Sequence, residues 1–342
     1  MAVTETQTAL ERVKTVLAHG IPDRVPLNFF AGWNPEVRAK VENRFGSVAA
    51  FSEMLHIDIF TGVVPNFPWT KSAKNTIDLN ELYRAPLINP LSDEIVETSA
   101  DAELFLTVRE AVEQYSGKKA VLAHVWGVFE LVQFQLGMEE ILVNLALEKE
   151  KLGRLFMRLA EWSARTVEKA VEAGVDGIEL SDDWGQNNVL LFNPKDWWNL
   201  IFPAEKLIVE AAKSANLPIL LHSDGDITQV LDGIVEMGVD ALHPVQESAG
   251  MDLKLMKEKY GDKLSIMGGL DTAEALPFKN ENEIRKEVER VLGILKPGGG
   301  YIFSGSHMIQ DDARLEVVEA AYKQAYEMGF YDLDRSKKQE KR

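Results

Sequence analysis

The chain has 342 residues, of which 46% are hydrophobic and 27% charged, and its formal net charge is −17. This balance is typical of a soluble globular protein rather than a disordered or membrane one. The acidic charge argues against nucleic acid as a ligand, because phosphate binding depends on Lys and Arg. With no cysteine in the sequence, any metal site has to use nitrogen and oxygen ligands.

The two ends of the chain indicate no targeting or membrane segment. Residues 1–20, MAVTETQTALERVKTVLAHG, predict an N-terminal amphipathic helix without the unbroken apolar core of a signal peptide. No run of 18 apolar residues occurs, and residues 333–342 form a charged tail that we expect to fray. We therefore expect a cytoplasmic protein that does not enter the membrane.

Short apolar runs rich in β-branched residues alternate with helical patterns between the two ends. The runs predict eight strands, at 24–30, 58–65, 119–128, 175–183, 217–225, 239–246, 264–271 and 301–307. Eight such units predict a single-domain α/β fold, a (β/α)8 TIM barrel spanning residues 21–332.

Two segments between the predicted strands have distinct patterns. The clearest helix lies in 280–300, where Ile284, Val288, Val291, Leu292 and Leu295 form one apolar stripe before Pro297 and three glycines. Residues 71–118 are the least regular, so we expect an insertion after the second strand, ending in a helix at 107–115.

Polar residues cluster at the carboxyl ends of the predicted strands, where α/β barrels carry their reactive groups. They are Asn28, Trp126 with Glu130, Glu179 with Asp182 and Asp183, His222 with Asp224, His243 with Gln246, Asp271, Ser304, Ser306 and His307. A single residue such as Asp271 can equally cap the following helix. The whole set favours a functional site.

Three of these residues form a candidate metal site. His222 and Asp224 are two apart at the end of the fifth predicted strand, so both can face the barrel axis, and His307 ends the eighth. Two imidazoles and a carboxylate are a common ligand set for catalytic zinc, and the same types also serve non-haem iron. In the alternative interpretation, Asp224 caps a helix beginning at Ile227 and His222 is a hydrogen-bonded core residue.

The segment ELSDDW (179–184) places two adjacent carboxylates, Asp182 and Asp183, at the end of the fourth predicted strand. Neighbouring negative charges raise the pKa of one partner, which suits a general acid or a cation-binding edge. The alternative is a helix-capping aspartate with a solvated neighbour. Aromatic residues in or just after the strands, such as Trp126 and Trp184, can line a pocket for a flat apolar ligand or simply fill the core.

Several longer segments resemble one known superfamily. HSDGDITQVLDGIVEMGVDALHPVQ (222–246), MGGLDTAEALPF (267–278) and PGGGYIFSGSHMIQDDA (297–313) are similar to the uroporphyrinogen decarboxylase superfamily, in particular its corrinoid-dependent methyltransferases. Residues 127–145 and 182–198 resemble the same branch, so the likeness extends over residues 20–330. It implies an α/β barrel with its site at the carboxyl-end mouth, and a homodimer.

The sequence departs from the decarboxylases themselves. They carry an Arg-Gln-Ala-Gly-Arg segment after strand one, an aspartate after strand two and a tyrosine after strand three. This chain has NFFAGWNP (28–35), GVVPNFPW (62–69) and GVFELVQF (127–134) there, and only His307 remains at the place of a late histidine. Without the arginines, a substrate with many carboxylates is a poor fit.

The methyltransferases of the superfamily hold zinc with a His-x-Cys pair and a late cysteine. The resemblance implies that His222, Asp224 and His307 take these places. A site of nitrogen and oxygen ligands suits an oxygen leaving group better than a thiol. The resemblance therefore implies an O-demethylase of anaerobic metabolism, which passes the methyl group of a small aromatic methyl ether to the cob(I)alamin of a partner corrinoid protein.

Further roles follow from this interpretation. The metal would polarise the ether oxygen, while Asp182 or Asp183, with Glu130 nearby, would hold a ring hydroxyl or donate a proton. The residues expected to bind the substrate are Asn28, Trp126, Phe129, Trp184, Gln246 and Asp271.

Two other functions stay open. One is a metal-dependent decarboxylase of a small carboxylic acid, which needs a cationic pocket, although none of Arg24, Arg38 and Arg84 lies at a predicted strand end. The other is a non-catalytic barrel that binds a tetrapyrrole or a partner protein.

Overall fold

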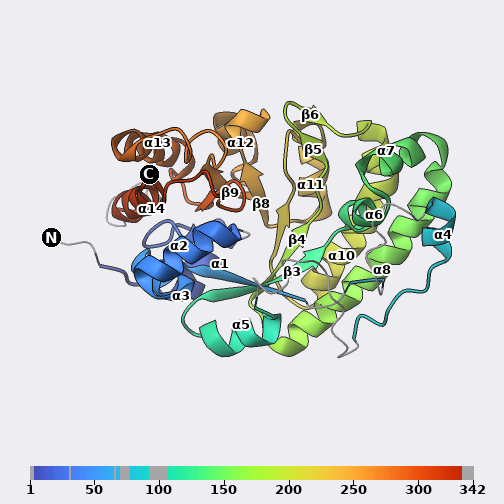
Figure 1. The fold of residues 1–342 in the computed structure, drawn as a ribbon, viewed down its shortest axis with the longest axis horizontal. Coiled ribbons are helices and arrows are strands. Elements are labelled where there is room, and N and C mark those ends of the chain that lie inside the picture. Colours follow the sequence, from blue (N-terminus) through green and yellow to red (C-terminus); the bar gives the residue numbers. More distant parts are fainter. Residues whose placement is uncertain (1–3, 31, 65–66, 70–77, 92–105, 333–342) are drawn as a thin grey trace, which may run out of the picture.

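The computed structural model describes residues 4–30, 32–64, 67–69, 78–91 and 106–332. Eight parallel strands form a nearly closed (β/α)8 barrel at the centre of the molecule (Figure 1). The strands are β1 (Leu27–Asn28), β2 (Ile59–Val63), β3 (Ala120–Trp126), β4 (Gly177–Ser181), β7 (Ile219–His222), β8 (Ala241–Val245), β9 (Ser265–Leu270) and β10 (Tyr301–Gly305). Each lies within one of the eight predicted ranges, so the fold prediction is confirmed.

From β2 to β10 each barrel strand pairs with the next barrel strand along the chain, and β10 pairs with β1, so that β1 and β2 are the two edges of the sheet. Between β1 and β2 the barrel is closed by Asp58, the residue before β2. Its backbone N–H donates to the carbonyl oxygen of Leu27 at 2.8 Å, and its carboxylate accepts the Leu27 N–H at 2.8 Å.

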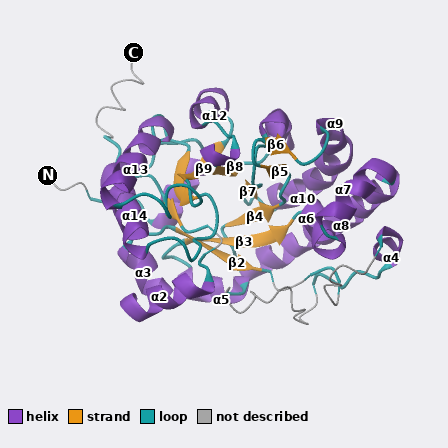
Figure 2. Ribbon diagram, turned by 45° about the horizontal axis from the view of Figure 1, so that its top comes forward, coloured by secondary structure: helices purple, strands orange, loops and turns teal. Residues whose placement is uncertain are grey.

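The helices surround the strands (Figure 2). The α-helices are α1 (Ala9–Leu17), α2 (Pro35–Phe45), α3 (Val48–Met54), α4 (Leu79–Arg84), α5 (Val108–Tyr115), α6 (Val128–Leu136), α7 (Met138–Leu147), α8 (Lys149–Ala173), α9 (Pro194–Asp196), α10 (Phe202–Ser214), α11 (Leu231–Met237), α12 (Leu253–Tyr260), α13 (Glu281–Leu295) and α14 (Leu315–Gly329). Single turns of other helix types lie at η2 (Trp197–Ile201), η3 (Thr228–Val230) and η4 (Glu247–Ala249).

Helix α1 lies against the amino-terminal end of the barrel. Its buried residues Val13 and Val16 pack in one cluster with side chains from inside the barrel, among them Leu122 and Leu220. The side chain of Ser265 donates to the carbonyl oxygen of Val16 at 2.8 Å. This helix, predicted in residues 1–20, therefore covers one opening of the barrel.

A buried ion network holds α1 in place. Arg12 of α1 donates to Asp23 at 2.7 Å and to Asp58 at 2.6 Å, and Arg24 donates to Asp58 at 2.7 Å. Burial disfavours the ionised form of Asp23, but hydrogen bonds from Arg12 and from the backbone of Gln7 and Thr6 outweigh it and lower its pKa to about 2. The network ties α1 to the start of β2.

The connecting segments agree only in part with expectation. The stripe predicted in 280–300 is fully buried on α13, and the expected helix at 107–115 is α5. Other parts of the expected insertion, 71–77 and 92–105, lie outside the described residues, as does the charged tail 333–342. A short hairpin of β5 (Gly185–Gln186) and β6 (Val189–Leu190) was not anticipated. In the described part of the chain, no helix combines the length and apolar character needed to cross a membrane.

Candidate metal centre at the carboxyl end of the barrel

The structure brings His222, Asp224 and His307 together, with one ligand atom of each within 4.8 Å of the others. Asp224 lies between the two histidines. Its Oδ1 atom is 3.8 Å from Nε2 of His222, and its Oδ2 atom is 3.7 Å from Nε2 of His307. Ligand atoms around a tetrahedral zinc ion are roughly 3.4 Å apart. Small side-chain movements would therefore suffice to coordinate one ion.

The state of Asp224 supports the fit of a cation. Its Oδ1 atom is buried and has no hydrogen-bond partner. Burial, and then the neighbouring carboxylate of Asp183, raise the pKa of Asp224 to about 8. A buried carboxyl group that lacks a counter-charge is stabilised in its ionised form by a bound cation.

The helix-capping alternative for Asp224 is not what the structure shows. The side chain of Asp226, two residues further on, accepts the backbone N–H of Thr228 at 3.0 Å. The expected helix at Ile227 begins instead as the turn η3, and α11 follows it. Asp224 is thus left without a capping role.

The reason for the closeness of His222 and Asp224 also differs from the expected one. Strand β7 ends at His222, so Asp224 lies in the following loop and not on the same pleat. Its backbone N–H donates to Asp183 at 2.8 Å. The hairpin β5–β6 packs so closely that a Cβ atom on Gly225, at φ +83°, would lie 2.2 Å from the carbonyl carbon of Gly185. Packing of this loop against the hairpin places Asp224.

A second histidine fixes the orientation of His222. The Nε2 atom of His243 lies 2.9 Å from the carbonyl oxygen of Gly305, which can only accept, so this nitrogen carries the proton. The Nδ1 atoms of His243 and His222 are 2.9 Å apart, and burial lowers the pKa of both residues, that of His243 to about 3. In the neutral pair His222 therefore donates from Nδ1, which leaves the lone pair on its Nε2 free for a metal ion.

The ring of Phe30 covers both imidazoles, with centroid distances of 4.3 Å to His222 and 3.9 Å to His243. The sequence placed His243 in the polar set at the strand ends and Phe30 among the aromatic residues that can line a pocket, but it did not predict their contacts with His222. The available signal was the presence of histidines on neighbouring strands, since His222 and His243 share one register position.

Asp182 has contacts that correct its predicted catalytic role. It is fully buried and accepts the backbone N–H groups of Phe129 at 3.2 Å and Glu130 at 2.7 Å, together with the indole N–H of Trp184 at 2.7 Å. Asp182 thus caps the amino terminus of α6, where the helix dipole favours a negative charge. The contacts support the helix-capping alternative.

Its neighbour Asp183 and Glu130 stay at the edge of the candidate centre. Oδ1 of Asp183 lies 3.6 Å from Nε2 of His222, and a third of the side chain is exposed. Glu130 is buried and accepts the hydroxyl of Ser181 at 2.7 Å. Burial, followed by repulsion from Asp183 and Asp182, raises the pKa of Glu130 well above its ordinary value.

The predicted aromatic pocket is only partly present. Trp126 is half-buried and lies edge-on to His124 and Phe134, at centroid distances of 4.4 and 5.0 Å. Phe129 and Trp184 are instead buried, with Phe129 against Phe192 and Trp184 against Trp197. These two offer no exposed face to a ligand, which corrects their predicted role.

The remaining predicted substrate residues have structural contacts. Asn28 is buried, and its backbone oxygen accepts the hydroxyl of Tyr322 at 2.7 Å. Asp271 accepts the backbone N–H groups of Ala273 and Glu274, both at 2.9 Å, and the amide of Gln246 at 3.2 Å. Asp271 therefore stabilises a turn, as a capping residue does.

The charges near the candidate centre are almost all acidic or imidazole groups. No lysine or arginine of the described residues is among the groups that shift the pKa values of Asp183, Asp224, His222 and His307. Arg24 is held by Asp58 and Glu5 next to α1, and Arg38 pairs with Glu42 on α2.

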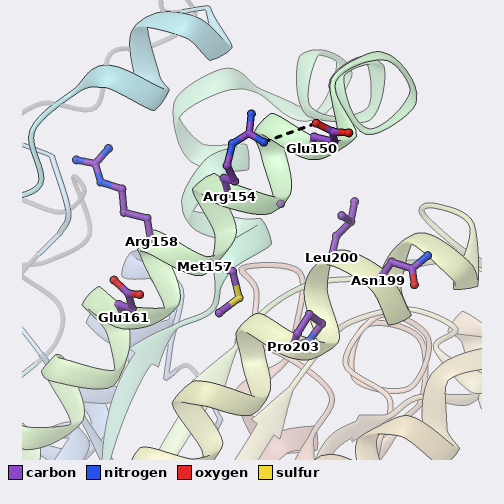
Figure 3. Close-up of a pocket in the computed structure, with 9 residues that line it drawn as sticks. Glu150, Arg154, Met157, Arg158, Glu161, Asn199, Leu200 and Pro203 are labelled. Atoms are coloured by element: carbon purple, nitrogen blue, oxygen red, sulfur yellow. Dashed lines mark ion pairs between the residues drawn. The ribbon is translucent and has the colours of Figure 1, made fainter.

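A surface pocket of about 440 Å³ lies elsewhere, between α8 and the segment from η2 to α10 (Figure 3). Its lining combines carboxylates, among them Glu150, with Arg154 and Arg158. None of the predicted site residues lines it.

The fold is an α/β barrel, and the candidate metal centre lies at the carboxyl ends of its strands. A family model described as "Uroporphyrinogen decarboxylase (URO-D)" matches residues 80–328. The chain therefore belongs to the uroporphyrinogen decarboxylase family, a family of enzymes.

Curated relatives are similar over part of their length. A uroporphyrinogen decarboxylase of Legionella pneumophila (strain Paris) is 28% identical over 183 residues, which cover 53% of this chain and 49% of the relative. The uroporphyrinogen decarboxylase of Alkalilimnicola ehrlichii is 27% identical over 169 residues, covering 47% of this chain and 43% of the relative. The matched part thus spans about half the length of these relatives or less.

Solved structures are similar over nearly the whole chain. A methyltransferase from Methanosarcina mazei has a TM-score of 0.69 at 16% identity, covering 94% of this chain and 98% of its own. A B12-independent methionine synthase from Shewanella has a TM-score of 0.50 at 10% identity, covering 93% and 95%. At these identities the likeness shows the fold alone.

Proposed function

We propose that the protein is a methyltransferase that moves the methyl group of a small aromatic methyl ether to the cob(I)alamin of a separate corrinoid protein. The observation that carries the proposal is the cluster of His222, Asp224 and His307, in which nitrogen and oxygen atoms surround one point. The fold shared with a methyltransferase from Methanosarcina mazei is compatible with it.

His222, Asp224 and His307 would hold a divalent ion, for which we propose zinc. Such an ion acts as a Lewis acid that stabilises negative charge on a leaving oxygen. His243 accepts a hydrogen bond from Nδ1–H of His222, which leaves the Nε2 lone pair of His222 available to such an ion. Asp183, 3.6 Å from that Nε2 atom, is placed to accept a hydrogen bond from a hydroxyl group at the ion.

The aromatic ring of the substrate would lie against Trp126, which the structure leaves half-buried beside Phe134. The corrinoid of the partner is a co-substrate of this reaction and would approach from the mouth. The other end of the barrel is covered by α1.

Membership of the decarboxylase family favours one alternative, the decarboxylation of a small carboxylic acid. This reaction needs a positive group to bind the carboxylate. After burial, the charged groups of the described residues that shift the pKa values of Asp183, Asp224 and His307 are carboxylates and imidazoles, so the charge balance favours a neutral ether.

The experiment uses zinc-loaded protein, guaiacol and chemically reduced free cobalamin as the methyl acceptor. We expect methylation of cobalt, followed by absorbance, in the wild type and its loss in His222→Ala. Asp226→Asn is the matched control, because Asp226 lies in the same loop but its side chain accepts the backbone N–H of Thr228. A wild type that methylates cobalt from none of a panel of methoxyarenes, also in the presence of corrinoid proteins, would contradict the proposal.

A further inference from the structure

A second polar cluster lies inside the barrel, on three neighbouring strands. His124 of β3 and Glu179 of β4 share one register position, and Thr61 lies on β2. The Nδ1 atom of His124 is 2.8 Å from Oε1 of Glu179, and the hydroxyl of Thr61 donates to Oε2 at 3.0 Å. Both oxygens of the Glu179 carboxylate thus have partners.

Strand alternation places this cluster in the interior. Leu122 and Ile59, two residues before His124 and Thr61, belong to the cluster of side chains inside the barrel. Ile178 and Leu180, on either side of Glu179, pack in the outer core under the helices. Because successive side chains of a strand alternate between its faces, the three polar side chains face inward.

The other ring nitrogen of His124 is left without a partner. Its Nε2 atom is buried and makes no hydrogen bond, although 15% of the side chain is exposed. A buried polar atom in this state costs free energy that a ligand or water oxygen would recover. The acceptor Glu179 fixes a proton on Nδ1, so the ring orientation is set in advance.

This cluster lies beside the candidate metal centre. Glu179 pairs in register with Leu220, which lies two residues before His222 on the neighbouring strand β7. The ring of Trp126, against which the substrate ring was placed above, meets the ring of His124 at 81°. A ligand that packs on Trp126 would therefore lie inside the barrel with both the candidate metal centre and the cluster of His124, Glu179 and Thr61.

We propose that Nε2 of His124, oriented by Glu179 and Thr61, is the binding site for a second oxygen of the ligand, a ring hydroxyl. The identity of the ligand as an aryl methyl ether rests on the proposed function. A hydroxyl both donates and accepts, so it satisfies Nε2 whether that atom carries a proton or a lone pair. A carboxylate in its place would lie near the negative charge of Glu179 and be repelled.

The test compares anisole with the three isomers of methoxyphenol, using zinc-loaded protein without a corrinoid. We expect the wild type to bind one methoxyphenol roughly 2- to 10-fold more tightly than anisole, the range for one net hydrogen bond, as measured by calorimetry. His124→Phe should lose this preference and keep its zinc. Thr61→Ser should keep the preference, and Thr61→Val, which has the same shape without the hydroxyl, should reduce it.

A wild type without a preference, or a preference that survives in His124→Phe, would overturn the inference. If the preference depends on His124 but no methyl group reaches cobalt, the site stands and the proposed methyl transfer is wrong. Zinc content and melting temperature of each variant separate loss of the hydroxyl site from loss of the metal or of the fold.

Discussion

The Nδ1 atoms of His222 and His243 lie 2.9 Å apart on neighbouring strands, and Nε2 of His243 is bound to the carbonyl oxygen of Gly305. Because this chain of hydrogen bonds directs the free lone pair of His222 toward Asp224, a substitution of His243 should act on metal binding without touching the metal. We expect His243→Phe to weaken zinc binding by roughly 10- to 100-fold.

His222→Ala and His307→Ala should lower zinc affinity further, since each removes a ligand. The measurement is a competition titration with a chromophoric chelator, with Asp226→Asn as the control expected to match the wild type. Zinc affinity unchanged in both His222→Ala and His307→Ala would show that the cluster does not bind the ion.

Glycine at position 127 is required by the capping of α6. A Cβ atom there would lie 2.3 Å from the Cβ of Asp182, whereas a Cβ on Gly293 in α13 would meet nothing within 4 Å. We expect Gly127→Ala to lower the free energy of unfolding by about 2 kcal/mol or more, as overpacking does. Gly293→Ala should raise it by about 0.5–1 kcal/mol, and urea denaturation of both variants checks the contrast.

Glu205 and Asp182 should make stability depend on pH. Burial, then Asp182, raise the pKa of Glu205 well above its ordinary value, and burial raises that of Asp182 to about 7. A carboxyl group whose pKa is higher in the folded than in the unfolded state contributes fully to the free energy of unfolding at pH values below its unfolded pKa. This contribution is lost as the pH rises through the folded pKa. These two carboxyl groups should therefore contribute less stability to the metal-free protein at pH 8 than at pH 5, whereas the lowered pKa values of His222 and His243 act in the opposite direction.

Glu205→Gln is the informative variant, because its amide stays uncharged at both pH values and can still accept the N–H of Val128, as Glu205 does at 2.8 Å. We expect it to melt at a higher temperature than the wild type at pH 8 and to match it more closely at pH 5. Equal melting curves of the two proteins at both values would contradict this assignment.

The ion network beneath α1 should be sensitive to the loss of its arginine. In Arg12→Ala the buried carboxylate of Asp23 loses its arginine, and Asp58 keeps only its ion pair with Arg24. Breaking a buried ion pair in this way should lower the free energy of unfolding by about 3–5 kcal/mol. Lys14→Ala, on the exposed side of the same helix, should change the free energy of unfolding by less than about 0.5 kcal/mol. Chemical denaturation distinguishes the two, and equal effects would show that the network adds no stability.

The same network should weaken in acid. The pKa of Asp23 is lowered to about 2, so its contribution to stability is present above the ordinary value of 3.8 and is lost as pH falls from there toward 2. Asp23→Asn should flatten this part of the stability profile, as measured by urea denaturation at a series of pH values.

The sequence predicted the eight strands because the strands of a parallel barrel are buried on both faces and therefore form short apolar runs. This pattern does not depend on the details of the surrounding helices. It did not predict the hairpin β5–β6, whose strands of two residues are too short to show alternation. The one local signal was Asn187-Asn188, since Asn188 adopts φ +62° and asparagine tolerates this region.

The candidate site was predictable in its residue types but not in its contacts. His222, Asp224 and His307 could be grouped because strand ends of a barrel meet at one mouth. Which of Asp182 and Asp183 caps α6 depends on a helix that begins some fifty residues earlier in the chain, and no local pattern carries that information. For the same reason the burial of Phe129 and Trp184 appeared only in the structure.

The position of α1 has a consequence for the order of events. Because Val13 and Val16 fill the amino-terminal end of the barrel, substrate and product would have to pass through the carboxyl end. A bulky acceptor bound there would block the exit of the molecule in the barrel. The smaller molecule then has to arrive first and depart last, and turnover would follow a compulsory sequence. Steady-state inhibition by a dead-end phenol, competitive against one co-substrate only, would reveal it.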